Sequence, residues 1–520
     1  MPKAMPIHLK LSEALDAAKK ASGGSYVFRG ADLKRSHMET LRGSGWIQLL
    51  HSGWYALVNP SKAMPGESLS YSTNYWEFVS KYLEEHYGEE YILAPKSSLA
   101  LHTADLSLPA ELLVQTPRNI YSTVNLPFNT SLFISRDKNF KKDRSIELMG
   151  IRVYALEAAI ANMGPPFFRE GSPLLEASLH AIKDPYEVSR FLVEDSSQTT
   201  AGRITACLKL IGRQREAGII EKAIAAAGLQ LKSEGDVETN FASRDLPRPS
   251  IIGARVASMW RGYSKEMAEA EELGEDLHVG SKKLFYDRPF SEIEAKINES
   301  YESDAYNSLS IEGYQVTEEL IAKIKSGELD LTDPTTGQKD KNALAARGYF
   351  EAFQLVLETI RKIHQGADAG DTICTDLVDW RMALFTPAVR AGSLPASSIA
   401  GFRQDAVYIR DSRHVPMQKD KILDAMECME YLLKKEEAFR RAVLGHHMLV
   451  HIHPFSDGNG RTARFLMNAC LVTAGLPWTV IKLDKKREYF AALETAHSGG
   501  TILPFARFIS NQIQSQKTLV

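Results

Sequence analysis

Cysteine is scarce in this sequence, with four residues in a chain of 520: Cys207, Cys374, Cys428 and Cys470. No two of them form a C-x-x-C pair, which argues against a disulfide framework and against a cysteine zinc site. Scattered, unpaired cysteines are typical of proteins whose thiols stay free in a reducing compartment. We therefore expect a cytoplasmic protein without disulfides.

Long apolar runs and a strong net charge are missing as well. No stretch of about 18 apolar residues occurs, so we expect no membrane span, and the N-terminal residues lack the apolar core of a secretory signal. The 62 lysines and arginines are nearly balanced by 65 aspartates and glutamates, for a net charge of −3. This balance gives no global attraction to nucleic acid, although a local basic face remains open.

The length of the chain predicts more than one domain, because domains average roughly 150 residues. Residues 244–249 read RDLPRP, and their two prolines favour a boundary at this point. We find no internal repeat and no low-complexity tract. Together with the patterns described below, the boundary divides the chain into four expected parts: 1–60, 61–245, 246–342 and 343–520.

The first part reads as two helices followed by a hairpin. Residues 12–20 and 31–41 are the helical candidates, and a Gly-Gly pair ends the first of them. The aromatic and aliphatic runs 46–50 and 54–58 flank a turn that contains Gly53, which is a hairpin signal. This order predicts a winged-helix-like unit.

The second and third parts differ in their periodicity. Strands are expected at 90–94 and 131–135, and helices at 174–182 and 201–227, so that residues 61–245 form an α+β region. From about residue 250 the pattern is mainly helical. A polar loop at 332–338 precedes a helix at 343–365.

The most informative stretch is HPFSDGNGRTAR, residues 453–464. Apolar residues at helical spacing precede it over 439–450, and Pro454 cannot continue that helix. A second helical pattern starts near Arg461 and ends before Gly475. The stretch is therefore a tight turn between two helices.

The residues of this turn are suited to holding a phosphate-bearing ligand. Gly458 and Gly460 let backbone N–H groups approach an anion, and the positive end of the second helix points at the turn. Arg461 and Arg464 lie one helical turn apart and present guanidinium forks that suit phosphate oxygens. The Asp457 carboxylate is the hard oxygen ligand that Mg²⁺ prefers.

A base stands beside this turn. His453 is the one group there whose ordinary pKa lies near neutrality, so it can take a proton from an incoming hydroxyl. His447 and His451 lie four residues apart, which is a metal-ligand spacing. No glutamate completes an H-E-x-x-H pattern, so ordinary helix positions are the favoured interpretation of these two histidines.

The string at 453–464 matches the signature of Fic-domain proteins, His-Pro-Phe-x-Asp/Glu-Gly-Asn-Gly-Arg-x-x-Arg, without a departure. This resemblance, which extends over about 300–513, implies a mainly α-helical C-terminal fold with a β-hairpin flap. It also implies transfer of AMP from ATP, with Mg²⁺, to a hydroxyl of a protein substrate. His453 would be the general base and Asp457 the Mg²⁺ ligand. The nucleotide-binding residues that the resemblance implies are Asp457, Gly458, Asn459, Gly460, Arg461, Thr462, Ala463, Arg464, Tyr489 and Phe490.

In this resemblance Asn459 and the glycine turn would bind the α-phosphate, Arg461 the α- and β-phosphates, and Arg464 the γ-phosphate. Residues 487–493, which include Tyr489 and Phe490, resemble the segment that closes the adenine pocket. Some relatives have Asn where His497 stands. For this reason the resemblance gives no clear expectation of a nucleotide contact at His497.

A second, shorter motif lies upstream. Ser308, Glu312 and Gly313 fit the Ser/Thr-x-x-x-Glu-Gly/Asn inhibitory motif of many Fic proteins. A bidentate ion pair between Glu312 and Arg464 would make Arg464 unavailable to the γ-phosphate. The same glutamate could instead position a water that removes AMP from a modified target, and the sequence does not separate the two directions.

Two further resemblances concern partners. Val407, Tyr408, Ile409 and Arg410 resemble the target-binding flap of Fic proteins, which implies docking of an extended protein segment. Residues 1–240 resemble AbiEi-type antitoxins in their pattern, which implies DNA or a protein as a partner. Lys34, Arg35 and Arg42 are either a solvated face or part of such a surface.

Several alternatives stay open at this point. The chain is expected to be an autoinhibited protein adenylyltransferase; the alternatives are a deAMPylase that uses Glu312 and a toxin–antitoxin-like regulator whose N-terminal half binds DNA or a partner. The transferred group is AMP or another phosphate-containing moiety, and the acceptor is a serine, threonine or tyrosine. Self-modification and a homodimer are consistent with the family.

Overall fold

The computed structural model describes residues 7–60, 68–169, 172–232, 237, 241–277, 285–328 and 340–517. The polar loop expected at 332–338 lies outside these residues. The chain divides into two compact units, and the first ends at Arg244, inside the proline-punctuated boundary. The first unit also includes Tyr408–Pro416, and the second comprises Asp245–Val407 and Met417–Val520. Whether each unit divides further as the sequence suggests stays a prediction.

The N-terminal part of the first unit contains the two expected helices and the expected hairpin, with one strand more. Its elements are α1 (Ile7–Ala21), β1 (Val27–Arg29), a 3-10 turn η1 (Gly30–Asp32), α2 (Arg35–Gly43), β2 (Ile47–His51) and β3 (Trp54–Leu57). The strands form an antiparallel sheet in the order β1-β3-β2. The second helix begins four residues later than the sequence pattern predicts, because η1 occupies the start of that segment.

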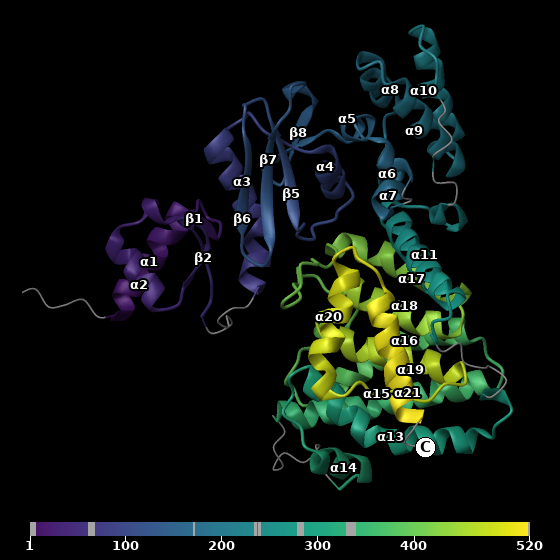
Figure 1. Ribbon diagram of the computed structural model, residues 1–520. Coiled ribbons are helices and arrows are strands. Elements are labelled where there is room, and N and C mark those ends of the chain that lie inside the picture. The colour runs from purple at the N-terminus through teal and green to yellow at the C-terminus, as the bar shows by residue number, and fades with distance from the viewer. Residues whose placement is uncertain are drawn as a thin grey trace, which may run out of the picture. The chain divides into compact units, whose positions relative to one another are not determined.

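A six-stranded mixed sheet follows. Its elements are α3 (Leu69–Tyr87), β4 (Ile92–Leu93), α4 (Pro95–His102), β5 (Glu111–Thr116), β6 (Tyr121–Leu126), β7 (Thr130–Arg136), η2 (Lys142–Arg144), β8 (Ser145–Leu148) and β9 (Ile151–Tyr154). The strand order is β6-β7-β5-β4-β9-β8, and β5 pairs parallel with β7. Leu112, Val114, Leu132 and Ile134 alternate along these two strands and share a core with Phe78 of α3. Figure 1 shows α3 beside the strands of this sheet. The strands expected at 90–94 and 131–135 are confirmed as β4 and β7.

Helices complete the first unit. They are α5 (Leu156–Ala161), α6 (Pro165–Arg169), α7 (Pro173–Ala181), α8 (Pro185–Glu194), α9 (Gln198–Leu210), α10 (Gln214–Ala226) and the turn η3 (Ala242–Asp245). The prediction of one continuous helix over 201–227 is wrong, because the helix is interrupted between α9 and α10. Gly212 lies there at φ +85°, in the left-handed region that glycine adopts without steric cost.

The second unit is helical. Its elements are α11 (Ile251–Glu272), α13 (Phe290–Ile311), α14 (Glu318–Ser326), α15 (Lys341–His364), α16 (Ala369–Arg390), η4 (Ala396–Ile399), η5 (Lys419–Lys421), α17 (Ile422–Lys435), α18 (Ala438–Ile452), α19 (Asn459–Thr473), η6 (Leu483–Lys485), α20 (Lys486–His497) and α21 (Leu503–Lys517). Side chains of Ser250, Asp340 and Asp368 cap α11, α15 and α16 by accepting backbone N–H groups, as N-cap residues do. The helix expected at 343–365 is confirmed as α15.

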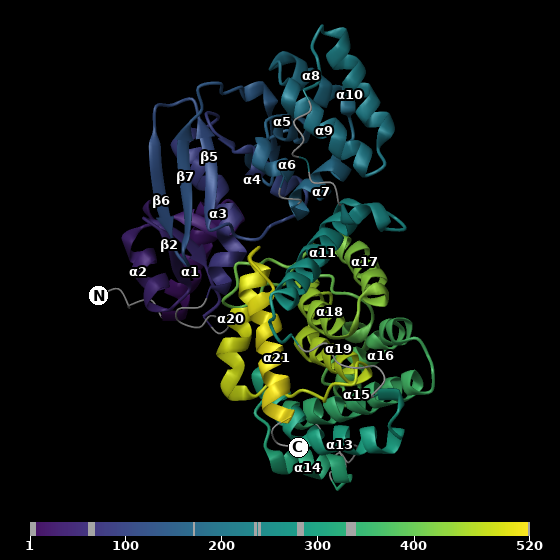
Figure 2. The ribbon, with the colours of Figure 1, turned by 45° about the vertical axis from the view of Figure 1, so that its right-hand side comes forward.

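Helix α19 is the centre of the second unit. Nearly all of its residues are buried, which is the pattern of a helix enclosed on all sides. Its neighbours along the chain and in space include α15, α16 and α18, and Figure 2 shows α13 running beside α15. The last residues of the 453–464 motif therefore form the start of a buried helix that packs against α15, α16 and α18.

The β-hairpin flap that the Fic resemblance implies is not formed. Residues 400–418 are all described, and none of them is in a strand. The buried guanidinium of Arg403 donates to the carbonyl oxygens of Asp405 and Met417. These two carbonyls lie on either side of the predicted target-binding residues. Their oxygen atoms accept hydrogen bonds from the Arg403 side chain and not from a neighbouring strand.

No helix among the described residues combines the length and apolarity that crossing a membrane requires.

Helices α15 and α16 approach each other closely at Gly348 in α15. A Cβ atom there would lie 2.1 Å from the carbonyl oxygen of Leu384 in α16. We expect Gly348→Ala to lower the free energy of unfolding by roughly 3 kcal/mol, because the two helix backbones must move apart. Urea denaturation followed by circular dichroism measures this change.

The matched control is Gly262→Ala in α11, where a Cβ meets nothing within 4 Å. It should stabilise by about 0.5–1 kcal/mol, because alanine is the better helix former. Equal stability changes in the two variants would contradict the close packing at Gly348.

Candidate active site

The turn between α18 and α19 has two residues in the left-handed region. His453 ends α18 at φ +53° and ψ +57°, and Gly458 begins α19 at φ +86°. A Cβ at Gly458 would lie 2.8 Å from the ring of Phe385, so the position requires glycine for space as well as for conformation. A histidine in this conformation is uncommon and is held there by its surroundings.

Two contacts hold His453. Its backbone carbonyl accepts a hydrogen bond from Arg403 Nε at 2.8 Å, and its Nδ1 lies 3.2 Å from the carbonyl oxygen of Val450. A carbonyl only accepts, so Nδ1 carries the proton and Nε2 keeps its lone pair. Arg403 has no counterpart in the sequence motif, and no local pattern marks it.

The environment keeps the imidazole neutral. Burial and, to a smaller extent, the nearby Arg403 lower the pKa of His453 to about 4, against the opposing effects of the Val450 carbonyl, Glu312 and Asp457. The side chain is therefore uncharged at neutral pH, and Nε2 is available as a base.

The loop 453–459 is closed on itself by Asn459. The amide N–H of Phe455 donates to Asn459 Oδ1 at 3.0 Å, and Asn459 Nδ2 donates to the carbonyl of Phe455 at 2.7 Å. Asn459 is 2% exposed. Its contacts in the structure thus define the loop shape, whereas the resemblance assigned it to a phosphate.

Arg461 is buried at the start of α19. One of its nitrogens, NH2, lies 3.2 Å from Asp457 Oδ1. Its guanidinium carbon lies 5.0 Å from the ring centre of Tyr314 and 4.9 Å from that of Phe385. These aromatic faces stabilise a cation and fix its direction, and neither residue was expected from the sequence.

Several buried donors at this turn have no acceptor within the described part of the chain. They are Nε and NH1 of Arg461, Oγ1 of Thr462 and NH1 of Arg464. Buried donors without acceptors are costly, and the first amides of α19 add further donors because a helix start leaves them unbonded. The set fits an anion with several oxygens, such as a polyphosphate.

Asp457 is the carboxylate of the site. Its Oδ1 accepts from the Gly458 amide at 2.6 Å and from Arg461, and its side chain is 58% exposed. The second oxygen remains for a cation. One carboxylate beside phosphates is the usual protein contribution to Mg²⁺ binding, so the donor set fits that ion.

Arg464 is already engaged by α13. Its NH2 lies 2.7 Å from Glu312 Oε1, its Nε donates to Ser308 Oγ at 2.9 Å, and its NH2 donates to the carbonyl of Ser308 at 3.1 Å. The expected Glu312–Arg464 pair is therefore present, but it uses one carboxylate oxygen. The bidentate form is wrong: Nε and NH2 donate to Ser308, and NH1 has no acceptor among the described residues.

The charge states of Glu312 and Arg464 favour their contact. Burial raises the pKa of Glu312, but Arg464 and Arg461 lower it more, so that it lies below its ordinary value. Burial acts against the charge of Arg464, yet Glu312 and its other neighbours hold the pKa of Arg464 above its ordinary range. Both partners are charged at neutral pH. Gly313, at φ +87°, lets the chain turn away directly after Glu312.

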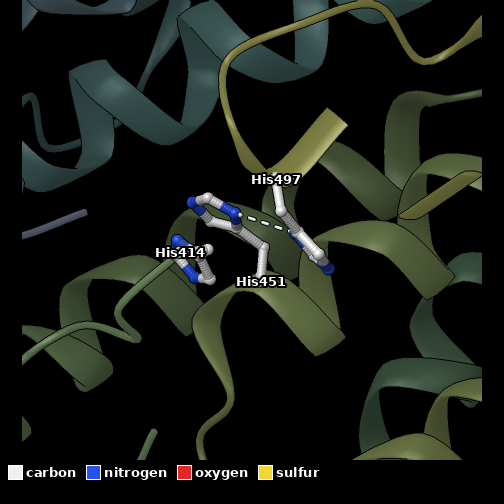
Figure 3. Close-up of side chains that lie close together, drawn as sticks. All are labelled: His414, His451 and His497. Carbon is white, nitrogen blue, oxygen red and sulfur yellow. Dashed lines mark hydrogen bonds between the residues drawn. The ribbon is translucent and has the colours of Figure 1, made fainter. Parts of the chain in front are cut away.

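The two residues expected at the adenine side, Tyr489 and Phe490, differ in their burial. Tyr489 is buried, and its hydroxyl lies 2.8 Å from His446 Nε2. Phe490 is 45% exposed. Figure 3 shows His451 and His497, whose Nδ1 atoms lie 3.3 Å apart. The His497 ring also stacks on His447 with centres 4.6 Å apart.

The remaining predicted residues lie where the motif places them. Gly460 stands in the first turn of α19, and a Cβ there would lie 2.4 Å from Glu312 Oε1. Ala463 is buried in the same helix. Val407, Tyr408, Ile409 and Arg410 follow one another in a segment without strands.

Residues 355–471 match the model of the Fic/DOC family. The protein adenylyltransferase Fic of Nematostella vectensis is 27% identical over 371 residues, which cover 69% of this chain and 82% of that protein. The protein of the same name from Aedes aegypti is 41% identical over 115 residues. The chain spans about a fifth of the length of that insect relative, 22%.

Solved structures of Fic proteins are similar at lower identity. Residues 134–508 of Fic-1 from C. elegans are 16% identical, with 70% of this chain and 90% of that chain covered and a TM-score of 0.36. A Fic-domain signalling protein from Bacteroides thetaiotaomicron is also 16% identical, covering 52% of this chain and 94% of that one, with a TM-score of 0.33.

The loop closure by Asn459 can be measured as stability. We expect Asn459→Ala to lower the free energy of unfolding by roughly 2–3 kcal/mol, because it leaves the N–H and C=O of Phe455 buried without partners. Chemical denaturation checks this value. Ser456→Ala, an exposed change in the same loop, should stay within about 0.5 kcal/mol, and a similar loss there would contradict the assignment.

Proposed function

We propose that this chain, which carries a Fic domain, is a protein adenylyltransferase that is restrained by Glu312. It transfers AMP from ATP to a hydroxyl of a protein substrate. The observation that carries the proposal is the set of buried donors of Arg461, Thr462 and Arg464 without acceptors, beside a neutral histidine. The Fic relatives named above support the reaction class.

The reaction follows from the positions of the groups. His453 Nε2 accepts the proton of the target hydroxyl as its oxygen attacks the α-phosphorus, and pyrophosphate leaves. The first amides of α19 and Arg461 bind the oxygens on which charge develops. Asp457 would hold Mg²⁺, which when bound neutralises charge on the phosphates.

Restraint follows from competition for one guanidinium. Arg464 can bind the terminal phosphate of ATP only if Glu312 moves away, because Glu312 Oε1 lies 2.7 Å from its NH2. Glu312 also stands directly over Gly460 in the first turn of α19, where the amides would receive phosphate. ATP held without Arg464 would present its α-phosphorus less well to the base.

Removal of the carboxylate tests the restraint. We expect Glu312→Gly to raise incorporation of label from α-³²P-ATP, into itself or a protein target, by roughly ten- to a hundredfold, the equivalent of a charged hydrogen bond. The double variant Glu312→Gly/His453→Ala should incorporate none. Glu318→Ala, an exposed acid in the next helix, is the matched control, and equal labelling by wild type and Glu312→Gly would refute the restraint.

The pH dependence tests the base. Transfer requires neutral His453, and the rate falls as pH falls through its pKa. Burial lowers that pKa to about 4 from an ordinary value of 6.5, and Glu312 acts to raise it, so removal of Glu312 lowers it further. In the Glu312→Gly variant we expect a flat rate from pH 8 to 6 and an acid limb below pH 5.

Initial rates of label incorporation in buffers of constant ionic strength give this profile. A half-maximal rate near pH 6.5 would show a solvated histidine and contradict the buried base.

A further inference from the structure

Helix α13 presents three polar side chains one turn apart, Asp304, Ser308 and Glu312. Residues four apart lie on the same helix face. Ser308 and Glu312 contact Arg464, as described above. Asp304 extends this face by one turn, and it is a charged residue that is 3% exposed. A buried carboxylate requires a specific partner.

That partner is Tyr349 of α15. Its hydroxyl donates to Asp304 Oδ2 at 2.7 Å, and both residues are buried. The Tyr349 ring lies 4.7 Å, centre to centre, from Phe465, which follows Arg464 in α19. Asp304 thus connects α13 to α15, and Tyr349 in turn packs on the residue that follows Arg464 in α19.

The charge states fit this contact. Burial raises the pKa of Asp304 to about 6, against the opposing effects of Tyr349 and Arg464. Asp304 is therefore a carboxylate at neutral pH, and it accepts the hydrogen bond that the Tyr349 hydroxyl donates. Burial also raises the pKa of Tyr349 well above its ordinary value, so Tyr349 keeps the proton that it donates.

Glu312 needs such an anchor because of where it stands. It lies just beyond the last residue of α13, as its C-cap, and its side chain is 29% exposed. It reaches Arg464 through one oxygen. Ser308, one turn earlier, accepts two further hydrogen bonds from Arg464, and the buried Asp304–Tyr349 bond lies on the same helix face two turns before Glu312.

We propose that Asp304 is a positioning residue of the restraint, holding α13 through Tyr349 so that Ser308 and Glu312 engage Arg464. This inference rests on the proposed function and extends the inhibitory face to Asp304-x-x-x-Ser308-x-x-x-Glu312. Asp304 itself contacts neither substrate nor the base.

A double-mutant comparison tests it. In the full chain, Asp304→Ala and Tyr349→Phe should each raise self-labelling from α-³²P-ATP by about tenfold, the equivalent of one charged hydrogen bond. Asp304→Asn keeps an acceptor for Tyr349 and should stay near wild type. In the Glu312→Gly background, Asp304→Ala should change labelling less than twofold, because there is no restraint left to release.

Glu302→Ala is the matched control, since it removes an acid from the same helix that pairs at the surface with Lys325, and it should label as wild type does. Unchanged labelling by both Asp304→Ala and Tyr349→Phe, where Glu312→Gly labels strongly, would overturn the inference. A loss of labelling from Asp304→Ala in both backgrounds would do so too, since it would show a structural role alone.

Amide hydrogen exchange separates this inference from the proposed function. Protection of residues 308–313 should fall in Asp304→Ala and Tyr349→Phe and persist in Asp304→Asn. If Glu312→Gly fails to label but the exchange pattern holds, the adenylyltransferase proposal fails and the positioning role stands. If exchange is the same in all three variants, the positioning role is refuted.

Discussion

The engagement of Arg464 by helix α13 is the interaction on which the rest of the site depends. A guanidinium buried in the central helix of a bundle must have acceptors, because an uncompensated buried charge is strongly destabilising. Here Glu312 and Ser308 supply them from a segment about 150 residues earlier in the chain. The same donors are those a phosphate would use. In the proposed function, the stability of the resting chain and access of the nucleotide therefore compete for one side chain.

This competition explains why the neighbouring donors are arranged as they are. Arg461 lies near the rings of Tyr314 and Phe385, and one of its nitrogens pairs with the exposed Asp457, while its Nε and NH1 have no acceptor among the described residues. Arg464, one turn later, pairs with Glu312 and donates to Ser308. The donors left for an anion are therefore mainly those of Arg461.

The base is prepared by geometry rather than by an acidic partner. His453 stands in a left-handed conformation at the end of α18, with its Nδ1 directed to a backbone carbonyl and its own carbonyl bound by Arg403. Burial keeps the ring neutral. These contacts come from the end of one helix and a loop 50 residues earlier, and they leave Nε2 as the free basic atom.

The sequence by itself determined the turn between two helices and the pairing of Glu312 with Arg464, because the glycine and proline positions and the 453–464 string restrict local backbone and chemistry strongly. It did not determine the flap, where a hairpin was expected and Arg403 binds the carbonyls instead. It also missed the break at Gly212, the contact of Glu312 with Arg464 through a single oxygen, and the contacts of Tyr314, Phe385, Asp304 and Tyr349. Those depend on which side chains meet across distant helices, and local periodicity carries no information about such meetings. Only the tertiary structure decided them, since a buried charge takes its partner from whichever element packs against it.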